Sequence, residues 1–426
     1  MCNKSIYTLI NRIRHNRTVI NGFLFTVFSF MSSGVNFILL IVLTKFLTPS
    51  EYGYLNLFNT FAMFMAIFIS FNAEKIIIVN YFKVGKQHTT ESIFSIISLS
   101  LLLLSAYVLV VLFSRDFLEA KIGFSILFLI LAIFSCFFDK ISGIIKAIWK
   151  AETNLKAFGV FSLITIIIEC VLTILLLYFS SLSWESRVLA QFFVWVIAGI
   201  ISLFILKKKN YFSFKTRFSI SKVKEALSFG VPLVPNTLSW WAMQGVNRFI
   251  INSYYGPAEV GMFSFAMNFS NIIQIISTAF AQSWHVDVFQ HLAEKKNGYT
   301  EYLSSFTRKM IVLYFFLSII FYVGAYFLIM FFFQPYGSSL NFLLPLTIGA
   351  FAHSLSTLFD CYLFYFKKTT ILMNVAGIVS IINVALGFIL IKYDLMYAAY
   401  ISMISEILIT LMYFYYSQKY VKLKIV

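Results

Sequence analysis

Long apolar stretches, separated by short clusters of charged residues, run through the whole chain. Twelve of them are long enough to cross the roughly 30 Å of hydrocarbon in a bilayer as helices. They fall near residues 18–44, 54–82, 92–113, 122–148, 157–179, 187–206, 227–255, 259–288, 309–333, 340–366, 369–391 and 394–417. A helix satisfies its own backbone hydrogen bonds in lipid, and no alternating short segments typical of a barrel are visible. The pattern predicts an all-α membrane protein with about twelve transmembrane helices.

Composition agrees with a lipid environment. Apolar residues make up 60% of the 426 residues and charged residues only 12%, whereas a soluble chain carries about a quarter charged. The four cysteines, Cys2, Cys136, Cys170 and Cys361, are too widely spaced for a disulfide framework or a metal site. We therefore expect no metal and no cofactor. The first apolar stretch is too long for a signal peptide, so we expect an uncleaved first span.

The basic residues predict the orientation in the membrane. If the N-terminus is cytoplasmic, 25 Lys and Arg fall in cytoplasmic segments and five on the opposite side. This asymmetry follows the positive-inside rule and predicts that both termini are cytoplasmic. It also gives the net charge of +16 a membrane explanation, so we expect no nucleic-acid partner.

A short motif occurs twice and indicates an internal duplication. Pro49–Gly53 and Pro257–Gly261 both read Pro-x-Glu-x-Gly and lie 208 residues apart. Each follows an outward-running span and precedes an inward-running one. A half with an even number of spans ends on the side of the membrane where it began, so the two halves are expected to be parallel repeats. The sequence thus predicts two six-helix lobes, residues 1–210 and 211–426, around a central cavity.

Polar side chains form stripes on the spans that follow the two motifs. The stripe on span 8 holds Ser264, Asn268, Asn271, Gln274, Thr278, Gln282 and His285. Span 2 carries Asn56, Asn59, Thr60, Ser70 and Glu74 on one face. Such groups are costly in lipid and are expected to face protein or water. Ordinary hydrogen bonding between helices is one explanation; a hydrated cavity lined by spans 1, 2, 7 and 8 is the preferred one.

Amides in such a cavity suit sugar hydroxyls, because each amide both donates and accepts hydrogen bonds. The candidate sugar-binding residues are Asn36, Asn56, Asn59, Gln244, Asn247, Asn268, Asn271, Gln274 and Gln282. Three acids within spans, Glu74, Glu169 and Glu406, are candidates for ion coupling because burial favours the protonated form. For each, a neutral or paired structural role is the alternative.

Signatures of enzymes are missing. Gly85-Lys86 is followed by Gln87, so it is no phosphate-binding loop, and no zinc-protease or serine-hydrolase motif occurs. The expected external loops are too short to build a glycosyltransferase or polymerase site. We therefore expect a secondary transporter and not an enzyme.

Several segments resemble the polysaccharide flippases of O-antigen and capsule pathways. They are Phe229–Pro235, Asn247–Ile251 and Glu259–Phe263, with Leu47–Gly53 and Ala279–Trp284 similar to the same family. The resemblance implies two six-helix lobes around a central cavity, within the superfamily of lipid II flippases and multidrug extruders. It implies that the chain moves undecaprenyl-pyrophosphate-linked oligosaccharides from the cytoplasmic to the outer leaflet of the bacterial inner membrane. The polymerase and glycosyltransferases of the same pathway are the implied protein partners.

The resemblance also directs attention to cations that could meet a pyrophosphate. Arg248 is the main candidate, since a guanidinium binds phosphate oxygens in a bidentate manner, and Lys75 and Lys140 could receive the phosphate nearer the cytoplasm. The family often has Asp-Arg where this chain has Asn247-Arg248, so a neutralising partner is missing. Alternatively, Arg248 snorkels outward or pairs with an acid such as Glu169. Other functions left open are a multidrug exporter of the same fold, a lipid II flippase and an O-antigen polymerase.

Overall fold

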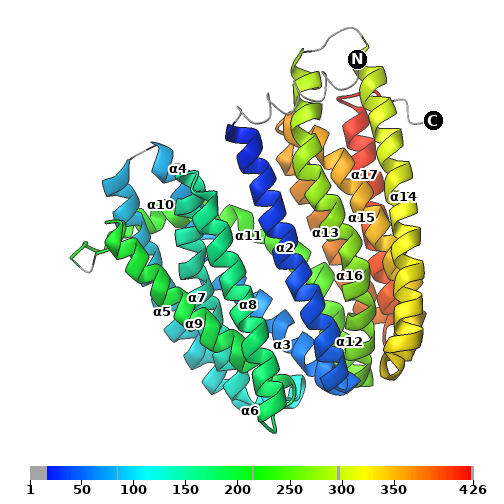
Figure 1. Cartoon of the computed structure of the whole chain (residues 1–426), viewed down its shortest axis with the longest axis horizontal. Coiled ribbons are helices and arrows are strands. Elements are labelled where there is room, and N and C mark those ends of the chain that lie inside the picture. Colours follow the sequence, from blue (N-terminus) through cyan, green and yellow to red (C-terminus); the bar gives the residue numbers. More distant parts are fainter. Residues whose placement is uncertain (1–16, 84, 214, 295–297, 424–426) are drawn as a thin grey trace.

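The structure, a computed structural model, describes residues 17–83, 85–213, 215–294 and 298–423. Figure 1 shows two helical bundles that converge at the bottom of the view and diverge toward the top. The N-terminal bundle contains α2 (Arg17–Phe46), α3 (Pro49–Phe68), η1 (Ala73–Lys75), α4 (Ile76–Lys83), α5 (Lys86–Phe113), α6 (Arg115–Ile122), α7 (Ile126–Ala151), α8 (Leu155–Phe179) and α9 (Trp184–Lys208).

The C-terminal bundle is entered through a broken segment. That segment comprises α10 (Ile220–Gly230), η2 (Val231–Leu233), α11 (Val234–Trp241), the π-helical turn η3 (Ala242–Val246) and α12 (Asn247–Tyr255). The bundle continues with α13 (Pro257–Glu294), α14 (Tyr299–Phe332), η4 (Gln334–Ser339), α15 (Leu340–Tyr365), α16 (Thr369–Leu390) and α17 (Met396–Gln418).

The prediction of an all-α, multi-span membrane protein is confirmed. Within the described residues, nine helices are long and apolar enough to cross a membrane, and the count is ten when α3 and the following η1–α4, bent by 61° against it, are taken as one broken span. The expected spans at 18–44 and 227–255 correspond to α2 and to the broken segment α10–α12. The count of twelve and the boundary between residues 210 and 211 remain predictions.

The bend between α3 and α4 has a specific packing partner. Phe71 and Asn72 have positive φ there, 49° and 58°, which interrupts the helix. Gly230 lies against this turn so closely that a Cβ on it would be 2.4 Å from the carbonyl oxygen of Phe71. Two breaks that are distant in sequence are therefore packed against each other, and only glycine permits that approach.

The broken segment α10–α12 belongs to both bundles. Its first part packs on the N-terminal bundle, α10 against α5 and η1, and α11 against α3 as well as α16. The Trp241 indole donates a hydrogen bond to the carbonyl oxygen of Thr60 at 2.9 Å. Its last part, α12, packs mainly on α13. The π-helical turn η3 lies where the segment passes from one neighbour to the other.

Helices α3 and α13 hold the bundles together at what we call the motif end, the end that carries the two Pro-x-Glu-x-Gly motifs. Both helices begin at the proline of their motif. A Cβ on Gly53 would lie 1.8 Å from the carbonyl oxygen of Pro257, and one on Gly261 would lie 1.9 Å from that of Pro49. The two motif glycines are thus required by the same close approach, made reciprocally.

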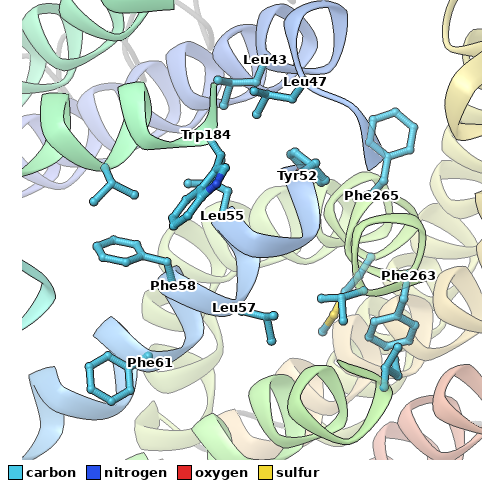
Figure 2. Packing of buried hydrophobic residues seen from close by; sticks show 14 of the residues in the cluster. Leu43, Leu47, Tyr52, Leu55, Leu57, Phe58, Phe61, Trp184, Phe263 and Phe265 are labelled. Carbon is cyan, nitrogen blue, oxygen red and sulfur yellow. The ribbon is translucent and has the colours of Figure 1, made fainter. Parts of the chain in front are cut away.

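Aromatic side chains fill the space around this crossing. The Tyr52 ring packs edge-on against Phe265 and Tyr336, with centroid distances of 6.1 and 5.8 Å, and Figure 2 shows Tyr52 of α3 close to Phe265 of α13. The Tyr336 hydroxyl donates a hydrogen bond to the carbonyl oxygen of Leu47 at 2.9 Å. We call Leu47, Tyr52, Phe265, Tyr336 and the two motif glycines the seal, because they close the space between the bundles at the motif end.

Candidate functional site

A cavity of about 560 Å³ lies in the N-terminal bundle, between α2 on one side and α7, α8 and α9 on the other. It is lined by Phe28, Ser32, Asn36, Lys146, Lys150, Phe158, Ser162, Thr165, Ile166, Glu169, Arg187, Gln191 and Trp195. We call it the N-terminal cavity. Its volume falls in the range of small-molecule sites, and its wall combines cations, hydroxyls, amides and aromatic rings.

The N-terminal cavity is positively charged. Lys146 and Lys150 lie one turn apart on α7, so their side chains leave the same face. The Nζ of Lys146 is 5.1 Å from the centre of the Trp195 ring, and the Nζ of Lys150 is 4.7 Å from that of Phe158. Arg187 pairs with Glu169 at 2.6 Å. The lining thus holds three cations and one carboxylate, which leaves a net positive charge for an anionic ligand.

Sequence reasoning missed these cations as site residues. Lys146 and Lys150 are among the 25 basic residues that the charge asymmetry assigns to cytoplasmic segments, yet α7 continues to Ala151 and carries both along the cavity. Arg187 is one of the five assigned to the opposite side of the membrane, but it lies in the first turn of α9 and reaches back to Glu169 on α8. The spacing of two lysines four residues apart at the end of an apolar helix was the available signal.

A second, much smaller cavity of about 30 Å³ lies in the C-terminal bundle, enough for about one or two waters. It is lined by Met243, Gln244, Met267, Ser270, Asn271, Gln274, Leu346, Gly349, Ala350, Asn383, Ser402, Met403, Ser405 and Glu406. We call it the C-terminal cavity. Glu406 pairs with His353 Nδ1 at 3.1 Å. The Asn383 amide donates to Ser405 Oγ at 2.9 Å, while its oxygen has no hydrogen-bond partner within the described part of the chain.

Arg248 lies at neither cavity but between the bundles, beside the seal. Its Nε donates to Ser264 Oγ on α13 at 3.0 Å, and one terminal nitrogen donates to Thr60 Oγ1 on α3 at 3.1 Å. The other terminal nitrogen is 3.5 Å from the sulfur of Met267. The side chain therefore links α12 to both bundles. Among the described residues no carboxylate pairs with it.

The other two predicted phosphate ligands are placed differently. Lys140 on α7 pairs with Glu74 at 2.9 Å, and Glu74 also accepts a hydrogen bond from Ser70 at 2.6 Å. The charge of Lys140 is thus largely neutralised, and that of Glu74 with it. Lys75 is exposed on η1 and lines neither cavity. Arg248, Lys75 and Lys140 do not come together in one site.

Four of the predicted sugar-binding amides line a cavity. Asn36 reaches the N-terminal cavity, and Gln244, Asn271 and Gln274 reach the C-terminal one. The predicted ion-coupling acids Glu169 and Glu406 also divide between the two cavities.

The remaining amides lie elsewhere. Asn56 donates to the carbonyl oxygen of Tyr52 in its own helix at 2.8 Å, and Asn59 is half-buried on α3. Asn247 donates to Ser402 Oγ at 3.4 Å, and Asn268 donates to the Tyr52 hydroxyl at 2.6 Å across the bundle interface. The side chain of Gln282 lies outside the described residues.

The expected cavity lined by spans 1, 2, 7 and 8 remains a prediction. Helices α3 and α13, which are spans 2 and 8, make the most extensive described contact between the bundles. Their polar stripes partly satisfy each other, as Asn268 does with Tyr52. One described cavity lies in each bundle, and the polar groups that meet across this contact need no water.

These features define an all-helical, multi-span membrane protein fold. A lipid II flippase, MurJ, in an inward closed conformation has a TM-score of 0.72 with 17% sequence identity, covering 92% of this chain and 87% of that one. A multidrug resistance MATE family transporter of the MOP superfamily, in an inward-facing conformation, has a TM-score of 0.69 with 14% identity, covering 93% and 94%. At these identities the likeness shows the fold.

The family is shown by sequence. A model of the polysaccharide biosynthesis protein family matches residues 19–285, and the chain belongs to that family. The capsular polysaccharide biosynthesis protein CapF of Staphylococcus aureus is 22% identical over 405 residues, covering 92% of this chain and 97% of that protein. The recognition made from the motif segments is confirmed.

Proposed function

We propose that the protein is a flippase that moves undecaprenyl-pyrophosphate-linked oligosaccharides across the bacterial inner membrane, by alternating access, for capsule or O-antigen synthesis. The observation that carries this proposal is the N-terminal cavity, where cations and aromatic rings line one pocket. A lipid-linked saccharide needs both, a countercharge for its diphosphate and flat apolar faces with nearby polar groups for its sugars. A multidrug exporter of the same fold takes mostly cations, which this pocket would repel.

Lys146 and Lys150 are the proposed diphosphate ligands. Side chains four residues apart on a helix have Cβ atoms about 5–6 Å apart, so two ammonium groups can each meet one of two adjacent phosphates. Arg187 lines the same cavity but is paired with Glu169 at 2.6 Å, so the two lysines carry the net positive charge of the lining. Sugar rings would pack on Trp195 and bond to Gln191 and Asn36, since these side chains line the same cavity.

The proposed direction of transport is outward. With both termini in the cytoplasm, as the basic residues predict, the motif end faces the outside and the seal closes it. The state described here would then open toward the cytoplasm. Exporting a negative charge down an inside-negative potential releases about 2.3 kcal/mol per charge per 100 mV, so no nucleotide-driven motor is required.

We propose that ion coupling resides in the C-terminal cavity. Glu406, which lines this cavity, is paired with His353, and the buried amide oxygen of Asn383, also in the lining, has no hydrogen-bond partner among the described residues. Glu74 is a weaker candidate, because it is paired with Lys140. Glu169 is better explained as the partner of Arg187.

Binding of inorganic pyrophosphate to the purified protein in nanodiscs tests the proposal. The double variant Lys146→Met/Lys150→Met should weaken binding at least about tenfold, and Lys156→Met should leave it unchanged. Lys156 is the matched control, because it is exposed at the start of α8 and does not line the cavity. In proteoliposomes the double variant should also stop translocation of an undecaprenyl-pyrophosphate-linked saccharide. Wild-type binding and transport in the double variant would reject the proposal.

A further inference from the structure

Beside the seal lies a buried cation, Arg248, for which the described residues provide no counterion. Arg248 is 8% exposed, and its three described polar contacts are two neutral hydroxyls and a thioether sulfur. The hydroxyl of Tyr52 nearby is engaged by Asn268 at 2.6 Å. Among the described residues, the guanidinium beside the closed seal is thus held only by weak, uncharged acceptors.

Such an arrangement costs free energy that opening the seal would recover. A charge removed from water without a paired charge loses more solvation than a few hydrogen bonds to neutral groups restore. Thr60 belongs to α3 and Ser264 to α13, so parting these helices would break one of the bonds and admit water. The charge of Arg248 therefore favours the open seal, even though its hydrogen bonds span the closed one.

We propose that Arg248 forms a second diphosphate-binding site, which becomes accessible only as the seal opens, so that the anionic headgroup of the substrate itself drives opening. This inference rests on the proposed function, since it requires an anionic substrate. Arg248 lies eight residues before Gly256, about 12 Å along the helix axis from the motif end. Its planar fork of donors suits phosphate oxygens better than the hydroxyls that hold it in the closed state.

Linkage gives the expected size of the effect. A ligand that binds only the open state raises the ratio of open to closed protein by a factor of 1 + [L]/Kd. At a ligand concentration of one hundred times Kd this factor is about one hundred. A diphosphate at Arg248 would thus convert a rare open state into a well-populated one, and would do so only when substrate is present.

The test measures the distance between the bundles at the motif end. Spin labels would be placed at Ser181→Cys and Lys392→Cys, one in each bundle and both exposed, in a background without the four native cysteines. Distances would be recorded in nanodiscs without ligand, with inorganic pyrophosphate, and with sulfate at equal ionic strength. In the wild type, pyrophosphate should raise the population with longer distances at least about tenfold, and sulfate should raise it far less.

Two variants distinguish two roles for Arg248: a charge that favours the open seal, or a side chain whose hydrogen bonds stabilise the closed one. Arg248→Met should lower the open population without ligand and abolish the response to pyrophosphate. Thr60→Val removes an acceptor across the interface but leaves the charge, so it should raise the open population without ligand. A higher open population in Arg248→Met would show that Arg248 stabilises the closed seal, and it would overturn the inference.

The remaining outcomes are equally decisive. An equal response to sulfate would overturn the diphosphate assignment, and no response to pyrophosphate in the wild type would overturn the second site. In the latter case the proposed function would still stand if pyrophosphate binding depends on Lys146 and Lys150. Arg248→Lys keeps the charge and should retain most of the response, which distinguishes loss of the site from a general defect in folding.

Discussion

A single methyl group at Gly53 should force the seal apart. In Gly53→Ala the new Cβ would lie 1.8 Å from the carbonyl oxygen of Pro257. Ordinary carbon–oxygen contacts are about 3.3 Å or longer, so α3 and α13 would have to separate by about 1.5 Å. The atom in the way belongs to the backbone at the start of α13, and it cannot move aside as a flexible side chain would.

The energetic consequence follows from the cost of overpacking. Inserting a methyl group into a tight interface costs about 1–3 kcal/mol, and 1.4 kcal/mol is a factor of ten in an equilibrium constant. The closed seal should therefore become about 5- to 150-fold less favourable relative to an open one. Gly261→Ala should do the same, because its Cβ would lie 1.9 Å from the carbonyl oxygen of Pro49.

The assay is the distance between spin labels at Ser181 and Lys392, together with transport in proteoliposomes. Both alanine variants should show longer distances without ligand, and slower transport because the closed seal is part of the cycle. Gly143→Ala is the matched control, since a Cβ there meets nothing within 4 Å. Unchanged distances and transport in both seal variants would refute the reasoning that the glycines are required for closure.

Three further predictions concern the paired charges and the topology. Glu74→Gln should destabilise the protein by about 3 kcal/mol in thermal unfolding, because it leaves the half-buried charge of Lys140 without a partner. Adding Lys140→Met should recover most of this loss. A double variant in which the two losses simply add would contradict the reasoning. Glu406→Gln should slow transport at unchanged pyrophosphate affinity, and unchanged flux would remove Glu406 from ion coupling. A cysteine at Ser183 should react with an impermeant label from outside sealed cells and one at Lys209 should not; the reverse pattern would overturn the orientation.

The apolar pattern was sufficient to predict where the chain crosses the membrane, because length and hydropathy decide that locally. It could not predict the break between α3 and α4. No glycine or proline occurs from Ile69 to Lys75, and the turn at Phe71 is instead packed against the distant Gly230. A break that is stabilised by tertiary contact leaves little signal in its own residues.

The sequence predicted the types of residue at the candidate site but not where the fold places them. Gln244 and Arg248 lie four residues apart, a spacing that places two side chains on one face of a regular helix, but the π-helical turn Ala242–Val246 changes the number of residues per turn between them. Gln244 consequently faces the C-terminal cavity and Arg248 the seal. Lys146 and Lys150 could not be predicted as site residues for another reason. The sequence around a lysine near the end of a span does not distinguish a side chain that lines a cavity from one that contacts lipid headgroups.

The broken segment α10–α12 has a consequence for any attempt to produce the protein in pieces. A cut in the connection after α9 would leave α10 and α11 on the second fragment, although they cover α5 and α3 of the first. The first fragment alone would expose the carbonyl of Thr60 and the turn at Phe71, and the second would carry Trp241 and Gly230 without their neighbours. The two fragments should therefore recognise each other through this segment, and co-expression should reconstitute a complex that neither forms alone.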